Sequence, residues 1–384
     1  MSKKVISILL AACMSVVLFT GCGKSSSSSS SNADPTKGVS KKEPHSNSMK
    51  GKTIGYILAG SDIYYQKGYE VFDALATDAG AKVTKLSSNY DPKVETNNVQ
   101  DLIAKKVDAI VIVTVSSANG AQMAKLANEA KIPIFFTEAL PNNNVGKPDG
   151  SVSGDWYKSG YNEGKLAGEK YGKNAKIVMI EGAYGTATPE LHRMGFDQGF
   201  GDAVGKTAAQ VFDQNVVFNQ TAQWATDKAQ TVMQDALAKT GGDFNLIFVQ
   251  NEAMKDGVIK ALKPTGKTYP IYTINGQETT IKQVKAGTIA ATSSIPPTSE
   301  AEMAFQQMCC KFAGVDYPKY LKNVNILVVK SNASSKSILP WLNVTSYLSM
   351  IKNGKTGIDI SVMTDVGPTD PDWTKIASQD GAKS

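Results

Sequence analysis

The strongest constraint on the fold is a regular alternation of short apolar runs with longer amphipathic stretches, which begins near residue 51. Several of the runs are almost continuously apolar, as in residues 108–113 (Asp-Ala-Ile-Val-Ile-Val). Such strands are typical of parallel sheets that are covered by helices on both faces. Right-handed crossovers between parallel strands then give open, doubly wound sheets, so the sequence predicts an α/β fold.

This pattern extends along most of the chain. The predicted strands cover residues 53–59, 83–87, 108–113, 132–137, 176–180, 210–216, 245–249, 270–274 and 323–329. The predicted helices cover residues 64–79, 94–105, 117–130, 158–171, 189–203, 222–239, 253–262 and 300–314. A single hydrophobic core rarely grows beyond about 250–300 residues, so we expect two α/β lobes.

The amino terminus resembles an export signal rather than part of the fold. Two lysines precede an apolar run at residues 5–19, which is short for a membrane span. The run ends in Phe-Thr-Gly-Cys22, which resembles the lipobox of bacterial lipoproteins, and residues 25–31 are all serine. A polar tether of this kind buries nothing and stays flexible. We therefore expect residues 1–22 to be a lipoprotein signal peptide, with Cys22 as the lipid anchor, and residues 23–50 to be a Ser-rich tether. An ordinary secretory signal is the alternative.

Composition and charge indicate a globular protein and exclude several other classes. The 384 residues are 41% hydrophobic and 20% charged, which is typical of globular proteins. The net charge of +6 comes from 41 basic and 35 acidic side chains that are interspersed, so we expect a mixed surface and no nucleic-acid partner. Four cysteines and two histidines argue against a zinc site built from Cys and His pairs, and we expect no metal in the site. Adjacent cysteines rarely form a disulfide, so we expect Cys309 and Cys310 to be buried small hydrophobic residues.

The predicted carboxyl ends of the strands are polar, small or rich in amides. In open α/β sheets, ligands bind beyond these ends. The ends in question are residues 59–62, 115–117, 137–139, 181–183, 250–252 and 275–277. They carry no Ser-His-Asp set, no Cys-His pair and no zinc-protease motif. The sequence therefore favours a binding cleft without a cofactor over a surface hydrolase.

Five segments carry a resemblance to one known family: residues 100–112, 132–138, 181–186, 247–254 and 285–292. The segment Ile-Phe-Val-Gln-Asn-Glu-Ala-Met at 247–254 is the most specific, because it is close to that family's AQND-x-M turn. The chain resembles the periplasmic sugar-binding proteins of ABC transporters, of the ribose-binding type, whose lobes also occur in LacI-type regulators. The resemblance implies a type I periplasmic-binding-protein fold, with two doubly wound parallel-sheet lobes joined by a multi-strand hinge.

The resemblance also implies where the lobes divide. The amino-terminal lobe would consist of residues 51–154 and 297–322. The carboxy-terminal lobe would consist of residues 155–296 and 323–384. The part after Lys330 extends past the similarity, and we expect it to be an extra tail packed on the second lobe. A surface for a partner is the alternative role of this tail.

Several ligand-binding residues follow from the resemblance. Tyr64 and Tyr65 match positions where the family places aromatic rings against the sugar, although core-facing rings are the alternative. Glu138 matches an acid that accepts hydrogen bonds from two hydroxyls. Trp224 matches a ring that stacks on the C–H face of the sugar. Asn251 matches the family's ligand-binding Asn, with a turn residue as the alternative.

Four positions depart from the family's pattern. His192 and Ala139 stand where the family has arginines. Asn275 replaces an aspartate, and Ile295 replaces a glutamine at the hinge. Losing two guanidinium forks and a carboxylate makes the cleft less charged, so we expect a neutral ligand other than ribose, with His192 and Asn275 among its contacts. The imidazole of His192 ordinarily has a pKa of about 6.5, so we expect it to titrate against the ligand. The alternative is that it points to solvent and Arg193 takes its place.

These expectations together describe an extracytoplasmic solute-binding lipoprotein, anchored to the cell membrane by its lipid. It would capture a small sugar or polyol between its lobes and deliver it to the permease of an ABC transporter. The alternative is a ligand-sensing subunit for a membrane histidine kinase or chemoreceptor. We expect a monomer. A DNA-binding regulator is excluded, because the chain has an export signal and no helix-turn-helix.

Overall fold

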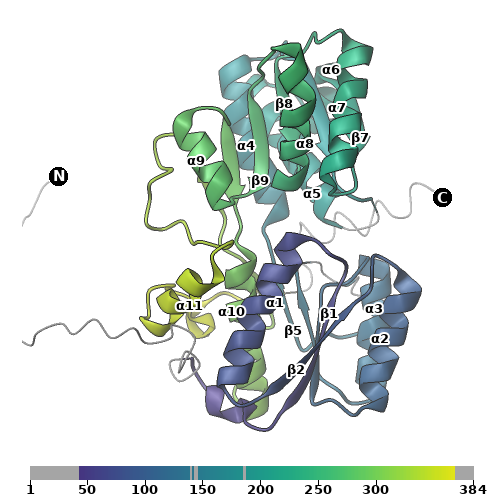
Figure 1. Ribbon diagram of the computed structural model, residues 1–384, viewed down its shortest axis with the longest axis vertical. Coiled ribbons are helices and arrows are strands. Elements are labelled where there is room, and N and C mark those ends of the chain that lie inside the picture. The colour runs from purple at the N-terminus through teal and green to yellow at the C-terminus, as the bar shows by residue number, and fades with distance from the viewer. Residues whose placement is uncertain (1–42, 139–140, 142–145, 185–186, 368–384) are drawn as a thin grey trace, which may run out of the picture. The chain divides into compact units, whose positions relative to one another are not determined.

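The computed structural model describes residues 43–138, 141, 146–184 and 187–367. All of them belong to one compact unit, Pro35–Ser384. They form two six-stranded sheets, each with helices on both faces (Figure 1). This arrangement confirms the predicted α/β fold with two doubly wound lobes.

The amino-terminal lobe contains a wholly parallel sheet with the strand order β11-β5-β4-β3-β1-β2. Its strands are β1 (Thr53–Leu58), β2 (Lys82–Ser87), β3 (Ala109–Ile112), β4 (Ile134–Thr137), β5 (Gly150–Ser153) and β11 (Tyr320–Lys322). Its helices are α1 (Ile63–Asp78), α2 (Pro92–Ala104), α3 (Ser117–Glu129), α10 (Pro297–Ala313) and α11 (Val344–Lys352). Successive strand residues face opposite sides of the sheet. Tyr56 therefore packs with α1 and α10, whereas Ile57 packs with α2 and α3.

The carboxy-terminal lobe has the strand order β12-β10-β9-β8-β6-β7, in which β12 runs antiparallel to β10 and the other pairs are parallel. Its strands are β6 (Ile177–Glu181), β7 (Val216–Thr221), β8 (Leu246–Val249), β9 (Ile271–Asn275), β10 (Ala291–Ser294) and β12 (Ile326–Val328). Its helices are α4 (Trp156–Tyr171), α5 (Ala187–Val204), α6 (Ala208–Asn215), α7 (Thr226–Thr240), α8 (Glu252–Leu262) and α9 (Glu278–Ala286). Phe248 packs on the side of α4, α5 and α6, and Val249 packs on the side of α7 and α8.

Three crossings join the two sheets and form the hinge. The chain leaves the first sheet after β5 and enters α4, and it returns from β10 into α10. It then crosses from β11 to β12. At the hinge, Asn323 donates to the carbonyl oxygen of Pro296 (2.9 Å) and accepts from the hydroxyl of Ser299 (2.5 Å). These bonds hold two of the three crossings together.

Helices α4 and α5 pack unusually closely because glycines line their contact. A Cβ atom added to Gly160 would lie 2.0 Å from the carbonyl oxygen of His192, and one added to Gly164 would lie 2.0 Å from that of Phe196. Gly195 approaches the carbonyl oxygen of Tyr157 in the same way. Only glycine permits backbones to approach this closely. The pairing fixes the start of α5 relative to the start of α4.

One predicted strand is wrong. Residues 210–216 form most of α6 and the beginning of β7 rather than a strand. The hydroxyl of Thr207 accepts from the backbone N–H of Gln210, and the side chain of Gln210 accepts from the backbone N–H of Thr207. This reciprocal capping box starts a helix, and it outweighs the short apolar pair that suggested a strand.

Both ends of the described chain pack on the amino-terminal lobe, which corrects two expectations. The tether does not extend to residue 50, because Met49 is fully buried in the core of this lobe and Ser48 donates to the carbonyl oxygen of Cys309. The tail does not pack on the second lobe alone, because α11 joins the core of the first lobe through Tyr347 and Ile351. Hydrophobic burial decides both placements. Cys22 and the rest of the signal and tether lie outside the described residues.

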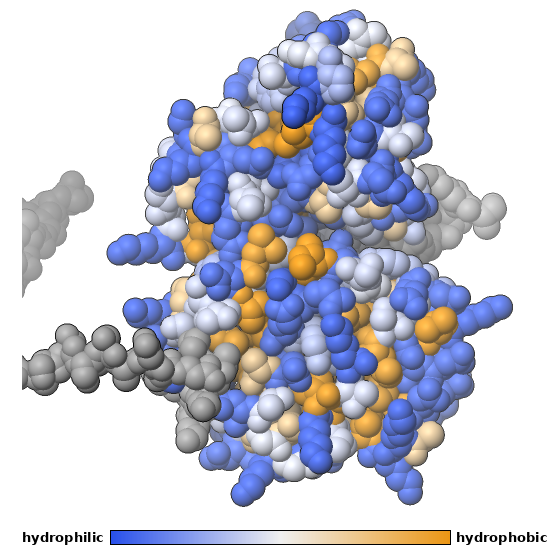
Figure 2. All heavy atoms as spheres, viewed as in Figure 1, coloured by the Kyte–Doolittle hydropathy of each residue, from blue (hydrophilic) through white to orange (hydrophobic). Residues whose placement is uncertain are grey.

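Other expectations about the chain are met. Cys309 and Cys310 are free and buried in α10, as predicted. The face shown in Figure 2 is mostly hydrophilic with scattered apolar side chains, which fits a mixed surface. Within the described ranges, every helix is too short or too polar to cross a membrane.

Candidate functional site

A cavity lies between the two lobes, at the carboxyl ends of the strands. Its empty space is about 310 Å³, including the open mouth. Side chains from both lobes line it: Asp62, Tyr64, Tyr65, Glu138, Trp156, Thr188, His192, Trp224, Gln250, Asn251 and Asn275. All seven side chains that the sequence predicts as ligand contacts are among them. The fold thus brings the whole predicted set together, although their roles toward a ligand stay predictions.

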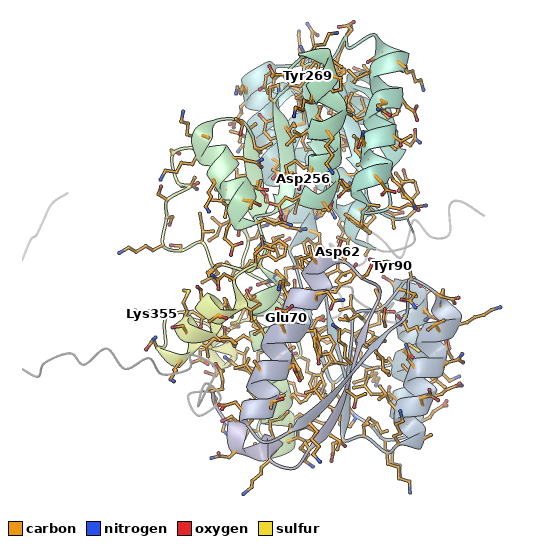
Figure 3. The ribbon with its side chains drawn as sticks, in the orientation of Figure 1. Asp62, Glu70, Tyr90, Asp256, Tyr269 and Lys355 are labelled. Carbon is orange, nitrogen blue, oxygen red and sulfur yellow. The ribbon has the colours of Figure 1, made fainter. Side chains whose placement is uncertain are left out.

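The strand ends position most of these side chains. In the first lobe, β1 leads into Asp62, the N-cap of α1, and into the two tyrosines of the first turn of that helix, and β4 leads into Glu138. Figure 3 shows Asp62 at the end of α1 that faces the second lobe. In the second lobe, β8 leads into Gln250 and Asn251, and β9 ends at Asn275. The carboxyl ends of both sheets therefore meet at this cavity, as expected for open α/β sheets.

Three lining residues adopt a left-handed backbone conformation. Glu138 has φ 65°, Trp224 has φ 63° and Asn275 has φ 113°. Positive φ is uncommon in residues with a Cβ, and such conformations gather at functional sites. Next to Trp224, a Cβ added to Gly182 would lie 2.1 Å from the indole, so this glycine makes room for the ring. The backbone is thus shaped to turn these side chains toward the cavity.

Glu138 connects the two lobes. Its carboxylate oxygen accepts from the hydroxyl of Thr188 in α5 (3.1 Å). Its carbonyl oxygen accepts from the indole N–H of Trp156 (3.2 Å) and from the hydroxyl of Ser153 (2.8 Å). Burial raises the pKa of Glu138 to about 8, helped by the nearby charge of Asp62 and opposed by the bond from Thr188. Near neutral pH the carboxyl is protonated, so it can both donate and accept a hydrogen bond.

His192 is fully enclosed rather than solvent-facing. Its exposed fraction is 1%, and neither ring nitrogen has a hydrogen-bond partner within the described part of the chain. Burial lowers its pKa to about 3, so the predicted titration between pH 5 and 8 is wrong. A neutral imidazole in this position has one donor and one acceptor free for a ligand.

Arg193 does not take the place of His192. Its guanidinium lies 3.4 Å from the buried Asp197 and over the ring of Phe212, and none of these three residues lines the cavity. Consecutive residues of a helix point in different directions, so one position fills the cavity and the next faces away. The cavity therefore has no guanidinium from this helix.

The tyrosines and Asn251 have two roles each. Tyr64 donates through its hydroxyl to Glu300 (3.0 Å), and its ring lies edge-to-face against Tyr65 and Trp156. Both tyrosines thus contribute to the packing and line the cavity. The side-chain oxygen of Asn251 accepts from the N–H of Met254 (2.8 Å) and caps α8. Its NH₂ group can donate toward a ligand.

Sequence reasoning missed four lining residues. Asp62 caps α1 by accepting from the N–H of Tyr64 (2.7 Å), and burial raises its pKa. Gln250 bridges the N–H of Gly182 and the carbonyl oxygen of Pro189. Both missed residues belong to the strand ends that the sequence marks as polar, which was the signal. Trp156 and Thr188 carry no comparable signal, because the hinge and α5 deliver them from outside the strand ends.

Ile295 and Ala139 are the other two positions that depart from the family's pattern. Ile295 is fully buried in the hydrophobic core of the second lobe, and Ala139 lies outside the described residues. Among residues that the structure describes, no group of three or more His, Cys, Asp or Glu side chains could hold a metal ion. The lining of the cavity itself consists of aromatic rings and hydrogen-bonding side chains.

The chain is similar in sequence to known sugar-binding and polyol-binding proteins. The ribose import binding protein of Haemophilus influenzae is 29% identical over 224 residues, which is 58% of this chain and 72% of that protein. The xylitol-binding protein of Mycolicibacterium smegmatis is 27% identical over an alignment that covers 63% of this chain and 67% of that protein.

Solved structures share the fold. An ABC transporter solute-binding protein from Mycobacterium smegmatis with bound glycerol has a TM-score of 0.66 and 24% identity, covering 74% of this chain and 96% of that one. A solute-binding protein from Bacillus halodurans with bound myo-inositol also has a TM-score of 0.66, with 18% identity and the same coverage. Residues 54–314 match the family described as "periplasmic binding protein domain". Since this match spans more than half of the chain, the protein belongs to the periplasmic binding protein domain family.

Proposed function

We propose that this protein captures a small, neutral sugar or polyol between its two lobes and delivers it to the permease of an ABC transporter. The observation that carries the proposal is the composition of the interlobe cavity. Aromatic rings line it together with hydrogen-bonding groups, of which His192, the protonated Glu138 and the amides Asn251 and Asn275 are uncharged near neutral pH; burial raises the pKa of Asp62, the other acid in the lining. Such groups suit hydroxyls, and burying an ionic ligand among them without a partner would be costly.

The stacking ring supports a ligand with an apolar face. Trp224 lines the cavity from the turn after β7, held in its left-handed conformation next to Gly182. A sugar ring or an extended polyol presents C–H groups to such a surface and hydroxyls around its edge. The relatives and solved structures named above bind ribose, xylitol, glycerol and myo-inositol, which are all neutral and hydroxylated.

We infer that ribose is not the preferred ligand. The cavity offers the imidazole of His192 where the ribose-binding pattern has a guanidinium, and the amide of Asn275 where it has a carboxylate. Each exchange removes a charge-assisted hydrogen bond to a hydroxyl. A polyol, a deoxysugar or a pentose that lacks a hydroxyl in this corner fits the remaining groups better.

Closure of the two lobes is the conformational change by which ligand binding would be recognised by a permease. A ligand that contacts both lobes has a higher affinity for the closed form and shifts the population toward it. The bond between Glu138 and Thr188 shows that the lobes can approach within hydrogen-bonding distance. We propose that a monomer, anchored through Cys22, presents this closed form to the permease. A sensor kinase that reads the same closed form is the alternative partner.

A thermal-shift panel tests the proposal. We would compare ribose, xylitol, ribitol, myo-inositol and glycerol with the anions xylonate and glutamate. A ligand at 100 times its Kd adds about 2.7 kcal/mol to the free energy of unfolding, which raises the Tm by several degrees. We expect a neutral member to do this in the parent and far less in Trp224→Ala. A shift by the anions alone would contradict the proposal.

A further inference from the structure

The carboxy-terminal segment crosses between the lobes a fourth time. After β12, Ala333 and Ile338 pack in the core of the carboxy-terminal lobe. The next residue, Leu339, packs in the core of the amino-terminal lobe. We call residues 339–343 the strap. The three hinge crossings lie at the ends of β5, β10 and β11, so the strap is a separate connection.

Hydrogen bonds hold the strap to both lobes. On the second lobe, the carboxylate of Glu278 in α9 accepts from the backbone N–H groups of Leu342 (3.2 Å) and Asn343 (3.3 Å). On the first lobe, the hydroxyl of Thr298 in α10 donates to the carbonyl oxygen of Pro340 (3.3 Å). Figure 1 shows α9 above α11 on the side where the strap passes. A change in the angle between the lobes must therefore strain or break one set of bonds.

Trp341 is the buried centre of the strap and lies behind the cavity. Its side chain is fully buried, and its ring lies 5.8 Å from that of Tyr64 at an interplanar angle of 60°. The ring of Tyr64 lies 6.1 Å from that of Trp156, which lies 5.3 Å from that of His192. Four rings thus form a continuous edge-to-face chain from the strap, through α1 and the hinge, to α5. Such contacts add directional preference to the apolar burial.

Hydrogen bonding by the indole N–H does not explain why Trp341 is buried. Its indole N–H has no hydrogen-bond partner among the residues that the structure describes. A buried donor without a partner is destabilising, so the ring's shape and apolar area must be what holds it there. A phenylalanine ring could replace most of this contact without the unpaired donor.

We propose that Trp341 is a positioning residue, which supports Tyr64 from behind and, through the strap, holds the two lobes close together before any ligand binds. When the lobes open, the ring of Tyr64 moves away from the rings of the second lobe. The indole of Trp341 then loses part of its buried area. The strap therefore shifts the ligand-free population toward the closed form. This inference concerns the protein without ligand, so it stands or falls independently of the proposed ligand.

The test measures the distance between the lobes in the ligand-free, full-length protein. Spin labels on non-natural amino acids replace Gln100 of α2 and Gln234 of α7, which are both exposed, so that no cysteine is altered. Double electron–electron resonance then gives the distance distribution for the parent, Trp341→Ala, Trp341→Phe and Glu278→Gln.

We expect Trp341→Ala to shift the distribution to longer distances and Trp341→Phe to retain the parental one. Glu278→Gln should shift it in the same direction by less, since it weakens the bonds to Leu342 and Asn343 and leaves the ring in place. Should Trp341→Ala fail to fold, Glu278→Gln decides alone. A role in stability only would lower the Tm and leave the distances unchanged. Parental distances in Glu278→Gln and in any folded Trp341→Ala would overturn the inference.

Discussion

The glycine contact between α4 and α5 makes a quantitative prediction, and Gly160→Ala tests it. The new Cβ would lie 2.0 Å from the carbonyl oxygen of His192, whereas ordinary contact begins at 3.4 Å. The two helices would have to separate by about 1.4 Å, the difference between these distances. Backbone cannot yield as a flexible side chain can, so the substitution overpacks the interface.

The expected cost follows from two opposing terms. Overpacking costs about 1–3 kcal/mol and sometimes more, and a backbone clash belongs at the upper end. Replacing glycine by alanine inside a helix stabilises the helix by about 1 kcal/mol. We therefore expect Gly160→Ala to lower the free energy of unfolding by about 2 kcal/mol. Because the clash involves the backbone of His192, the variant should also bind its ligand less tightly.

Gly68→Ala is the matched control. Gly68 also lies inside a helix, α1, but its added Cβ would meet its nearest neighbour, the carbonyl oxygen of Pro297, at an ordinary 3.5 Å. We expect it to be neutral or stabilising by up to about 1 kcal/mol. Guanidinium unfolding followed by circular dichroism measures both variants. Equal stability of Gly160→Ala and Gly68→Ala would refute the reasoning.

Four other predictions concern the site and the anchor. Trp224→Ala and Asn251→Ala should each cost about 1–3 kcal/mol of ligand affinity by calorimetry, through lost stacking and unpaired hydroxyls; unchanged affinity in both would show that the ligand binds elsewhere. Ligand affinity should be flat from pH 5 to 7, because His192 is already neutral there, and a step near pH 6.5 that His192→Gln removes would contradict this. The folded-state pKa of Glu138 is raised from 4.5 to about 8, so its contribution to stability is complete below pH 4.5 and is lost as the pH rises to 8. The loss amounts to about 1.4 kcal/mol per pH unit over that window, and urea midpoints of Glu138→Gln should vary less steeply than those of the parent. Cys22→Ala should release the protein into the medium, whereas a variant that stays with the membrane fraction would refute lipid anchoring.

The sequence predicted the sheets wherever a strand is continuously apolar, because a strand buried on both faces needs that composition. This holds for β1, β3 and β8, with ends displaced by a residue or two. It fails for β5, β10 and β11, which are short or rich in serine and threonine and pair mainly because neighbouring strands and the hinge place them there. It also fails at α6, where a capping box decides the structure.

The site was predictable in position and only partly in chemistry. Strand ends and family matches pointed to all seven predicted residues, because parallel strands deliver their carboxyl ends to one edge. Trp156 and Thr188 reach the cavity from the hinge and from α5, which no local pattern reports. The charge states of His192 and Glu138 depend on burial from all sides, and this is a property of the folded chain. The path of the strap was likewise beyond the resemblance, because it lies in the part of the chain that extends past it.

The central claim is that a neutral, hydroxylated molecule binds between the lobes. The most direct test is a crystal structure of the protein with the neutral compound that gives the largest thermal shift. We expect the ligand to lie in the interlobe cavity, with its C–H face against Trp224 and its hydroxyls within hydrogen-bonding distance of His192 and Asn251. A ligand bound outside this cavity, or one whose charged group occupies the position beside His192, would contradict the account.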